Sequence, residues 1–119
     1  MKIPAEGKLL RVFIGEADKW QGQPLHEAIV HAAKRDGLAG ATVLKGFLGF
    51  GCKSHLHTAK ILRLSEDLPI VIEIVDGEEK INRFLPKLDA MVQEGLITLE
   101  RVQVVMYRAG GKAQEPGRP

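Results

Sequence analysis

The segment LPIVIEIV, Leu68 to Val75, is the clearest strand in the sequence. Successive side chains of a β-strand point to opposite faces, so Ile72 faces one way while Val71 and Val75 face the other. Apart from Glu73, the side chains on both faces are apolar. The segment therefore predicts a strand whose sheet is apolar on both sides.

The residues after this strand predict a helix and a last strand. Asp76, with Glu79 three residues later, resembles a capping box, in which two side chains satisfy the first backbone donors of a helix. Apolar residues then follow at helical spacing: Ile81, Phe84, Leu85, Leu88 and Val92. Pro86 lacks a backbone donor and is expected to kink this helix, which Gly95 closes. Leu96 to Tyr107 is expected to be the last strand.

The residues before Leu68 predict a strand, a helix and a second strand. Lys8 to Gly15 alternates as a strand does. Pro24 suits the first turn of a helix, and Gly37 suits its end. The apolar face of this helix has the expected spacing: Leu25, Ala28, Ile29, Ala32 and Ala33. Ala41 to Phe50 is expected to be a strand whose glycines mark a bend or a close approach of the backbone.

The order of elements is strand, helix, strand, strand, helix, strand. Two split βαβ units of this kind form a ferredoxin-like α+β sandwich, a four-stranded antiparallel sheet with both helices on one face. That arrangement leaves the other face bare, yet Phe13 opposes Val12 and Val71 opposes Ile72. Because a monomer would expose a large apolar patch, we expect a homo-oligomer that buries the open face.

Length and composition indicate one small globular domain. The 119 residues predict a single domain over 1–119, with an ordered core at about 8–108 and a flexible tail at 109–119. A hydrophobic fraction of 45% and a charged fraction of 27% exclude disordered, collagen-like and disulfide-scaffold proteins. The net charge of +2 is too small to indicate nucleic-acid binding. The single Cys52 and the lack of a long apolar run or signal peptide favour a cytoplasmic protein.

The segment GFLGFGCKSHLHTAKILR, Gly46 to Arg63, combines glycines with basic residues. Glycines let backbone N–H groups approach an anion closely, and basic side chains neutralise it. The segment therefore favours a phosphate-bearing ligand, although its spacing matches neither the P-loop nor the Rossmann fingerprint. The alternative interpretation is a mobile surface hairpin with a solvated basic face.

Other polar residues suggest further hypotheses. Cys52, His55 and His57 form C-x2-H-x-H, whose thiolate and imidazoles are ligands for zinc or copper. Glu16 and Asp18 are either paired carboxylates or cation ligands, or else charges of a solvated loop or of a helix N-terminus. No nucleophile has both a base and a third, orienting group, so the sequence gives no reason to expect an enzyme.

Several motifs resemble a known family. GATVLKGFLGFG, Gly40 to Gly51, resembles the second strand of the PII signalling superfamily where that strand runs into its T-loop, with Gly-Phe-Gly at 49–51. GEADKWQGQPLHEAIV, Gly15 to Val30, and LSEDLPIVIEIVD, Leu64 to Asp76, resemble the PII-like family called domain of unknown function 190. The resemblance covers about Lys8 to Tyr107.

The resemblance implies a homotrimer whose open sheet faces line its centre. It implies an adenine nucleotide, AMP, ADP or ATP, in the clefts between subunits, with no required cofactor. It also implies a regulatory protein, and not an enzyme, that signals through a mobile loop to a target such as a membrane transporter or an enzyme. A related trimeric fold is linked to divalent-cation tolerance, which keeps the metal hypothesis with Cys52, His55 and His57 as the alternative.

One departure from true PII proteins bears on the ligand. The connection at Gln93 to Gly95 has no room for the loop that wraps the phosphates in those proteins, which argues against the standard ATP mode and leaves AMP or another anion. The expected ligand-binding residues are Gly49, Phe50, Gly51, Lys53 and Arg63, with Arg101 and Arg108 from the next subunit. Cys52 to Lys60 is expected to be mobile until a ligand binds.

Overall fold

The structure, a computed structural model, describes residues 2–51 and 67–110. Its elements follow in this order: β1 (Glu6–Gly15), β2 (Lys19–Trp20), β3 (Gln23–Pro24), α1 (Leu25–Arg35), β4 (Thr42–Lys45), β5 (Pro69–Asp76), α2 (Glu78–Met91) and β6 (Leu96–Gln103). The predicted mobility of Cys52 to Lys60 concerns residues outside these ranges.

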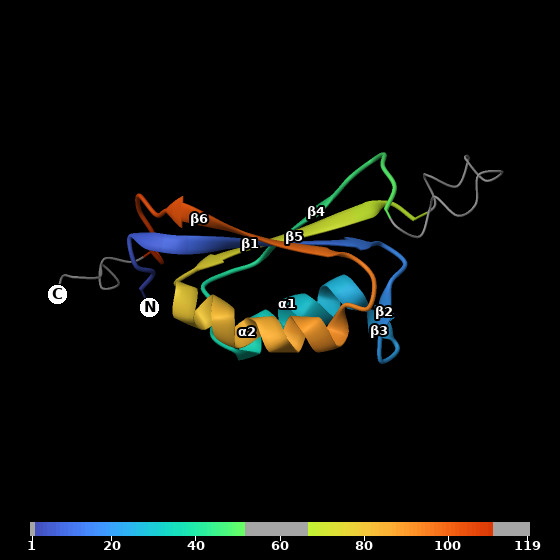
Figure 1. The fold of residues 1–119 in the computed structure, drawn as a ribbon, viewed down its shortest axis with the longest axis horizontal. Helices are drawn as coiled ribbons and strands as arrows, with labels where there is room; N and C mark the ends of the chain where they lie inside the picture. Colours follow the sequence, from blue (N-terminus) through green and yellow to red (C-terminus); the bar gives the residue numbers. More distant parts are fainter. Residues whose placement is uncertain (1, 52–66, 111–119) are drawn as a thin grey trace.

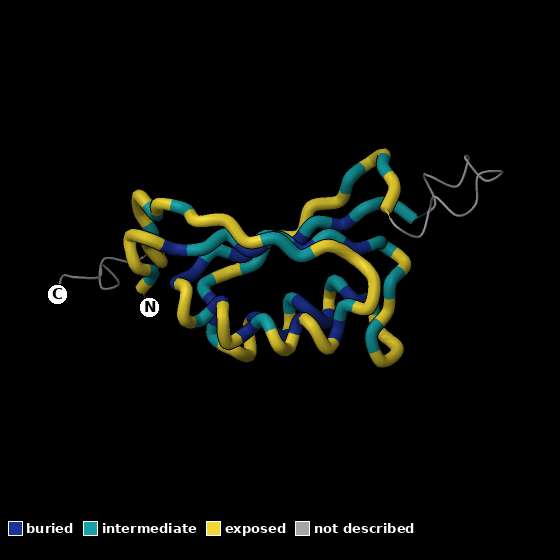
Figure 2. The backbone as a smooth tube through the Cα atoms, in the orientation of Figure 1, coloured by how far each residue is buried: buried dark blue, intermediate teal, exposed yellow. Residues whose placement is uncertain are grey.

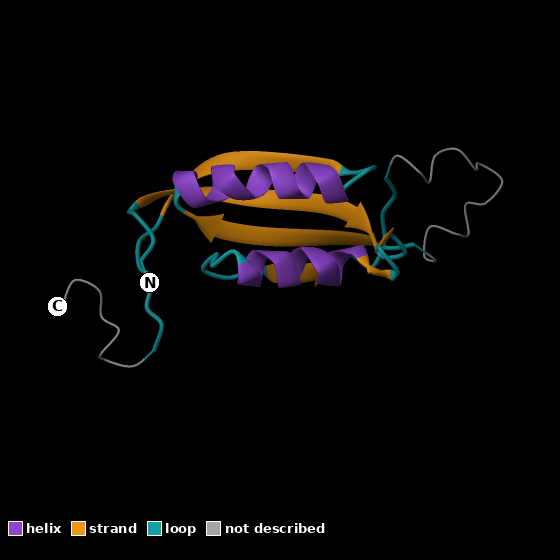
Figure 3. Ribbon diagram, turned by 90° about the horizontal axis from the view of Figure 1, so that it is seen from below, coloured by secondary structure: helices purple, strands orange, loops and turns teal. Residues whose placement is uncertain are grey.

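The main sheet has the strand order β4-β5-β1-β6, and every neighbouring pair is antiparallel. Both helices lie side by side on one face of it (Figure 1; Figure 3). This is the predicted ferredoxin-like α+β sandwich. Because β1 pairs with both β5 and β6, Phe13 has Val71 on one side and Leu96 on the other. The first and last thirds of the chain therefore meet at the same end of the sheet.

The core lies between the helices and the sheet (Figure 2). The inward side chains of β1 and β5 contribute its sheet half: Leu10, Val12, Ile14, Ile70, Ile72 and Ile74. The helices contribute the predicted apolar faces, among them Ile29, Ala32, Ile81, Phe84 and Leu88. The alternating apolar side chains of the strands and the regularly spaced apolar side chains of the helices thus pack into one layer. This layer stabilises the fold by removing apolar surface from water.

No described helix or strand covers the opposite face of the sheet (Figure 1). Leu44 and Leu96 are 48% and 56% exposed there. Arg11 lies on the same face and donates from Nε to Glu73 Oε2 at 3.0 Å and from Nη1 to Glu100 Oε1 at 2.9 Å. The hydrogen bond to Glu73, supported by Glu100, raises the pKa of the Arg11 guanidinium above its ordinary value.

Two predicted strands are longer than the real ones. β4 ends at Lys45, and the Gly46 N–H makes one further bond to the Pro69 carbonyl at 2.8 Å. Pro69 has no N–H with which to continue the ladder. β6 ends at Gln103, opposite the first residue of β1, because its partner strand begins there.

The capping-box prediction is wrong. α2 begins after Gly77 and has no side-chain cap. Asp76 is 1% exposed, and its carboxylate binds two backbone donors instead. Oδ1 accepts from the Gly77 N–H at 2.7 Å, and Oδ2 accepts from the Ala39 N–H at 2.9 Å. The carboxylate joins β5 to the connection between α1 and β4, a contact between distant segments that a local pattern does not contain.

Candidate functional site

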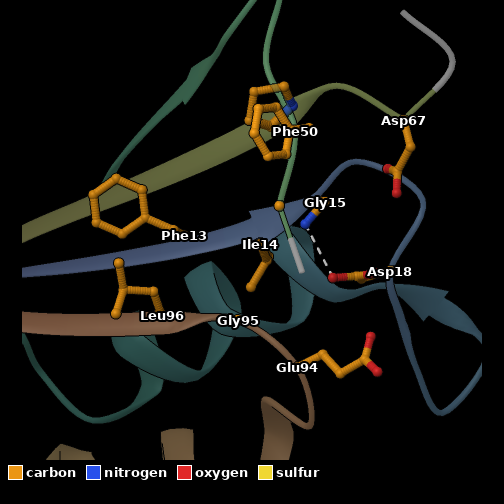
Figure 4. Close-up of a pocket in the computed structure, with 11 residues that line it drawn as sticks. Phe13, Ile14, Gly15, Asp18, Phe50, Asp67, Glu94, Gly95 and Leu96 are labelled. Carbon is orange, nitrogen blue, oxygen red and sulfur yellow. Dashed lines mark hydrogen bonds between the residues drawn. The ribbon is translucent and has the colours of Figure 1, made fainter. Parts of the chain in front are cut away.

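A pocket of about 340 Å³ opens at the end of the sheet where β1 finishes (Figure 4). We call it the sheet-end pocket, and its lining comprises Phe13, Ile14, Gly15, Asp18, Phe50, Gly51, Asp67, Pro69, Glu94, Gly95 and Leu96. These residues come from the end of β1, the segment after β4, the entry to β5 and the entry to β6. Antiparallel pairing of β1 with β5 and β6 brings the four segments together.

One part of the sheet-end pocket is apolar. Phe13 and Leu96 are direct partners across β1 and β6. Phe50 is 68% exposed and adds a second ring from the segment after β4. An aromatic ring this exposed beside a pocket is available to stack on a planar ligand.

The other part of the pocket carries carboxylates (Figure 4). Asp18 Oδ2 accepts from the Gly15 N–H at 3.0 Å, and Asp67 Oδ1 accepts from the Ala17 N–H at 2.8 Å. Both carboxylates thereby fix the turn that leaves β1, and Glu94 stands at the entry to β6. Among the described lining residues there are three carboxylates and no basic side chain. This half of the pocket attracts hydroxyl and amino donors and repels phosphate.

The structure brings two of the sequence-predicted ligand residues to the pocket, Phe50 and Gly51. Gly49 lies just before them, and a Cβ built on it would stand 3.0 Å from Pro69 Cγ. Its small size thus serves packing against β5. At Gly51 a Cβ would meet none of the described residues within 4 Å, so none of them fills the space beside this position.

The other predicted residues of the basic segment cannot be placed. Lys53 and Arg63, and the metal candidates Cys52, His55 and His57, lie outside the described residues. Their roles stay predictions. Within the part of the chain that the structure describes, no three His, Cys, Asp or Glu side chains gather as a metal site would require.

Arg101 and Arg108 are not at the pocket within one chain. Arg101 pairs with Lys8, whereas the pocket lies where Leu96 pairs with Phe13. Five residues of strand separate the two places, about 16 Å at roughly 3.3 Å per residue. Arg108 follows the far end of β6.

Sequence reasoning missed the residues that distant pairing brings in. Neither Asp67 nor Glu94 was expected to bind a ligand, and Leu96 was only the first residue of a strand. The one sequence signal for Asp67 and Glu94 is that each is a polar residue shortly before a strand. Loops at the ends of strands often carry the residues of a binding site. Of the alternatives for Glu16 and Asp18, the structure favours separate charges in a loop, because Glu16 binds Lys45 Nζ at 2.8 Å while Asp18 accepts from the Gly15 N–H.

Residues 7–104 match the family of domain of unknown function 190, described as "Uncharacterized ACR". The chain belongs to this family. A UPF0166 protein of Aquifex aeolicus is 42% identical over 98 residues, which is 82% of this chain and 92% of the relative. A UPF0166 protein of Methanocaldococcus jannaschii is 42% identical over 95 residues, 79% and 87% of the two chains.

Solved structures share the fold at low identity. A protein from Thermus thermophilus described as PII-like aligns with a TM-score of 0.59 at 21% identity and covers 85% of this chain and 91% of its own. CPII, a nitrogen regulatory PII-like protein from Thiomonas intermedia, was solved bound to ADP, AMP and bicarbonate; it aligns with a TM-score of 0.55 at 20% identity, over 86% and 96% of the two chains. The predicted PII-like fold is therefore confirmed.

Neither helix in the described ranges is long and apolar enough to cross a membrane.

Proposed function

We propose that this protein is a PII-like regulatory protein that binds an adenine nucleotide in the sheet-end pocket and is not an enzyme. The observation that carries the proposal is the pocket itself. It is a cavity of about 340 Å³ whose lining includes two aromatic rings and Gly51. Gly51 is the last glycine of the segment Gly46 to Arg63, and the basic residues of that segment follow it. The nucleotide-bound CPII structures support the ligand class through the shared fold.

The charges in the pocket orient the proposed ligand. Phe13 and Phe50 offer apolar faces to the adenine, and the carboxylates accept hydrogen bonds from its amino group or from the ribose hydroxyls. The phosphates must then point away from the carboxylates, toward Gly51 and the residues after it. Lys53 and Arg63 are the proposed phosphate partners, because Arg binds two oxygens at once and Lys supplies a compact charge.

The same reasoning requires a second subunit. We assign Arg101 and Arg108 to the pocket of a neighbouring copy, because the distance along β6 excludes them from their own. A homotrimer that buries its open sheet faces would place one pocket at each boundary between subunits. The bound nucleotide would then signal through the segment after Gly51 to a target protein, such as a membrane transporter or an enzyme.

The first test is a titration of the assembled protein with AMP, ADP and ATP by isothermal calorimetry. Arg63→Ala is expected to weaken AMP binding tenfold or more, a loss of about 1.5–3 kcal/mol for one charged hydrogen-bonding partner. Arg83→Ala, an exposed arginine on α2, is the matched control and should bind as the wild type does.

Gly51→Val extends the test to the pocket itself, because a side chain there would fill the space beside Phe50. Unchanged affinity in both Arg63→Ala and Gly51→Val would remove the ligand from this pocket. A melting temperature that rises with zinc or copper but with no nucleotide would favour the metal alternative at Cys52, His55 and His57.

A further inference from the structure

A second pocket, of about 630 Å³, lies beside the first. We call it the hairpin pocket. It is formed where the β2–β3 hairpin stands next to the start of α1 and the end of α2 (Figure 1). Asp18 and Glu94 line both pockets and therefore form the wall between them.

An aromatic ring and two apolar side chains make the body of the hairpin pocket. Trp20, on β2, packs against the core and still lines the pocket. Leu25 and Met91, both buried, are the apolar residues contributed by the two helices. The hairpin holds Trp20 in place through its pairing with Gln23 and through a tight turn in which Gln21 has φ 49°. A non-glycine residue is uncommon in this left-handed region, so the turn that positions Trp20 contains a strained backbone conformation at Gln21.

Acidic side chains outnumber basic ones in the described lining of the hairpin pocket. Its described lining contains two carboxylates, Asp18 and Glu94, against one ammonium group, Lys19. It also lies at the carboxyl end of α2, since Met91 is the last residue of that helix. The end of a helix carries a partial negative charge from its unpaired carbonyls, and the last turn of α2 contains no basic residue to offset it. The two carboxylates and the helix end favour a cation, whereas Lys19 opposes one.

We propose that the hairpin pocket binds a small organic cation of the ammonium or guanidinium class. The indole face of Trp20 would attract the cation through its ring electrons, and Asp18 and Glu94 would accept its N–H donors. Two carboxylates beside an indole and a thioether make a poor shell for Ca²⁺, which takes six to eight oxygen ligands. The volume lies in the usual range for small-molecule sites.

Trp20 makes the test direct, because the chain contains one tryptophan. The intact protein is titrated with arginine, spermidine and putrescine at constant ionic strength, and Trp20 fluorescence is recorded. We expect a saturable change with at least one of these cations. Citrulline, which has the shape of arginine without its charge, should leave the fluorescence unchanged. No saturable response up to millimolar concentrations, or an equal response to citrulline, would overturn the proposal.

A pair of charge variants locates the binding. Glu94→Gln should weaken binding of the responding cation about tenfold, because one of the two carboxylates loses its charge. Glu6→Gln removes the same charge at the far end of β1 and should bind as the wild type does. Equal weakening in both variants would mean that the cation responds only to the overall charge of the protein, and the pocket assignment would then be wrong.

Trp20→Leu, followed by calorimetry, tests the aromatic contribution separately and should also reduce the affinity. Unchanged affinity in this variant would remove Trp20 from the site. The nucleotide titrations use different ligands and different variants, so either proposal can fail without the other.

Discussion

At the scale of single residues, Asp76 shows how one buried carboxylate holds distant segments together. It accepts one backbone N–H from Gly77, at the start of α2, and one from Ala39, between α1 and β4. The same connection is held by Lys80, which donates to the Gly37 carbonyl at 3.1 Å, and by Tyr107, whose hydroxyl bonds the Ala39 carbonyl at 3.3 Å. A buried carboxylate is stable in this position because both backbone donors are directed at it.

Asp76→Asn is expected to lower the free energy of unfolding by about 1–3 kcal/mol, because the amide turns an NH₂ group toward one of the two backbone donors. Asp89→Asn, at an exposed position of α2, is the matched control and should stay within about 0.5 kcal/mol of the wild type. Urea unfolding followed by circular dichroism measures both. Equal stability of the two variants would contradict the assigned role.

At the scale of elements, the contact between β4 and the entry to β5 sets where the chain leaves the sheet. A Cβ built on Gly46 would stand 2.9 Å from Pro69 Cγ, and one built on Gly49 would stand 3.0 Å from the same atom. The chain after β4 therefore lies flat against the proline ring. This close approach directs Phe50 and Gly51 to the sheet-end pocket.

Gly46→Ala should lower the free energy of unfolding by about 1–3 kcal/mol, since the rigid proline ring gives way only if the backbone shifts. Gly40→Ala makes the same chemical change where a Cβ meets nothing within 4 Å. That variant should be neutral or stabilised by up to about 1 kcal/mol. Thermal unfolding of the two proteins compares them, and a Gly46→Ala variant as stable as Gly40→Ala would argue against the contact.

At the scale of the whole molecule, the two faces of the sheet differ in what covers them. The helices bury the inward side chains of β1 and β5, whereas the other face leaves Leu44 and Leu96 about half exposed beside the Arg11 network. Apolar side chains gathered on an uncovered sheet face are typical of a surface between subunits. The charged network at its centre would fix how two copies align, because unlike charges must meet across the interface.

Leu44→Glu should therefore break the proposed trimer into monomers, because it puts a charge into an apolar interface. Ala90→Glu makes a comparable change on the exposed side of α2 and should leave the assembly intact. Analytical ultracentrifugation at micromolar concentration gives the mass of each, and circular dichroism confirms that both are folded. A wild-type protein that sediments as a monomer would overturn the assembly itself.

The sequence by itself determined the layers of this protein. Alternation in Leu68 to Val75 and helical spacing from Ile81 to Leu88 report which side of each element is buried, and burial against a common core is what orders the elements into a sandwich. The glycines and Phe50 near the end of β4 also pointed to the end of the sheet where the pocket lies.

Only the tertiary structure decided the chemistry of the sites. Asp67 and Glu94 are distant in sequence, and they share a pocket because β1 pairs with both β5 and β6. The same pairing places Arg101 at the far end of the sheet. The local pattern predicted that Asp76 caps α2 together with Glu79, whereas in the fold its carboxylate accepts a hydrogen bond from the Ala39 N–H. The physical reason is that a periodic pattern records the burial of each side chain one element at a time, whereas contacts between elements depend on the order in which the strands pair.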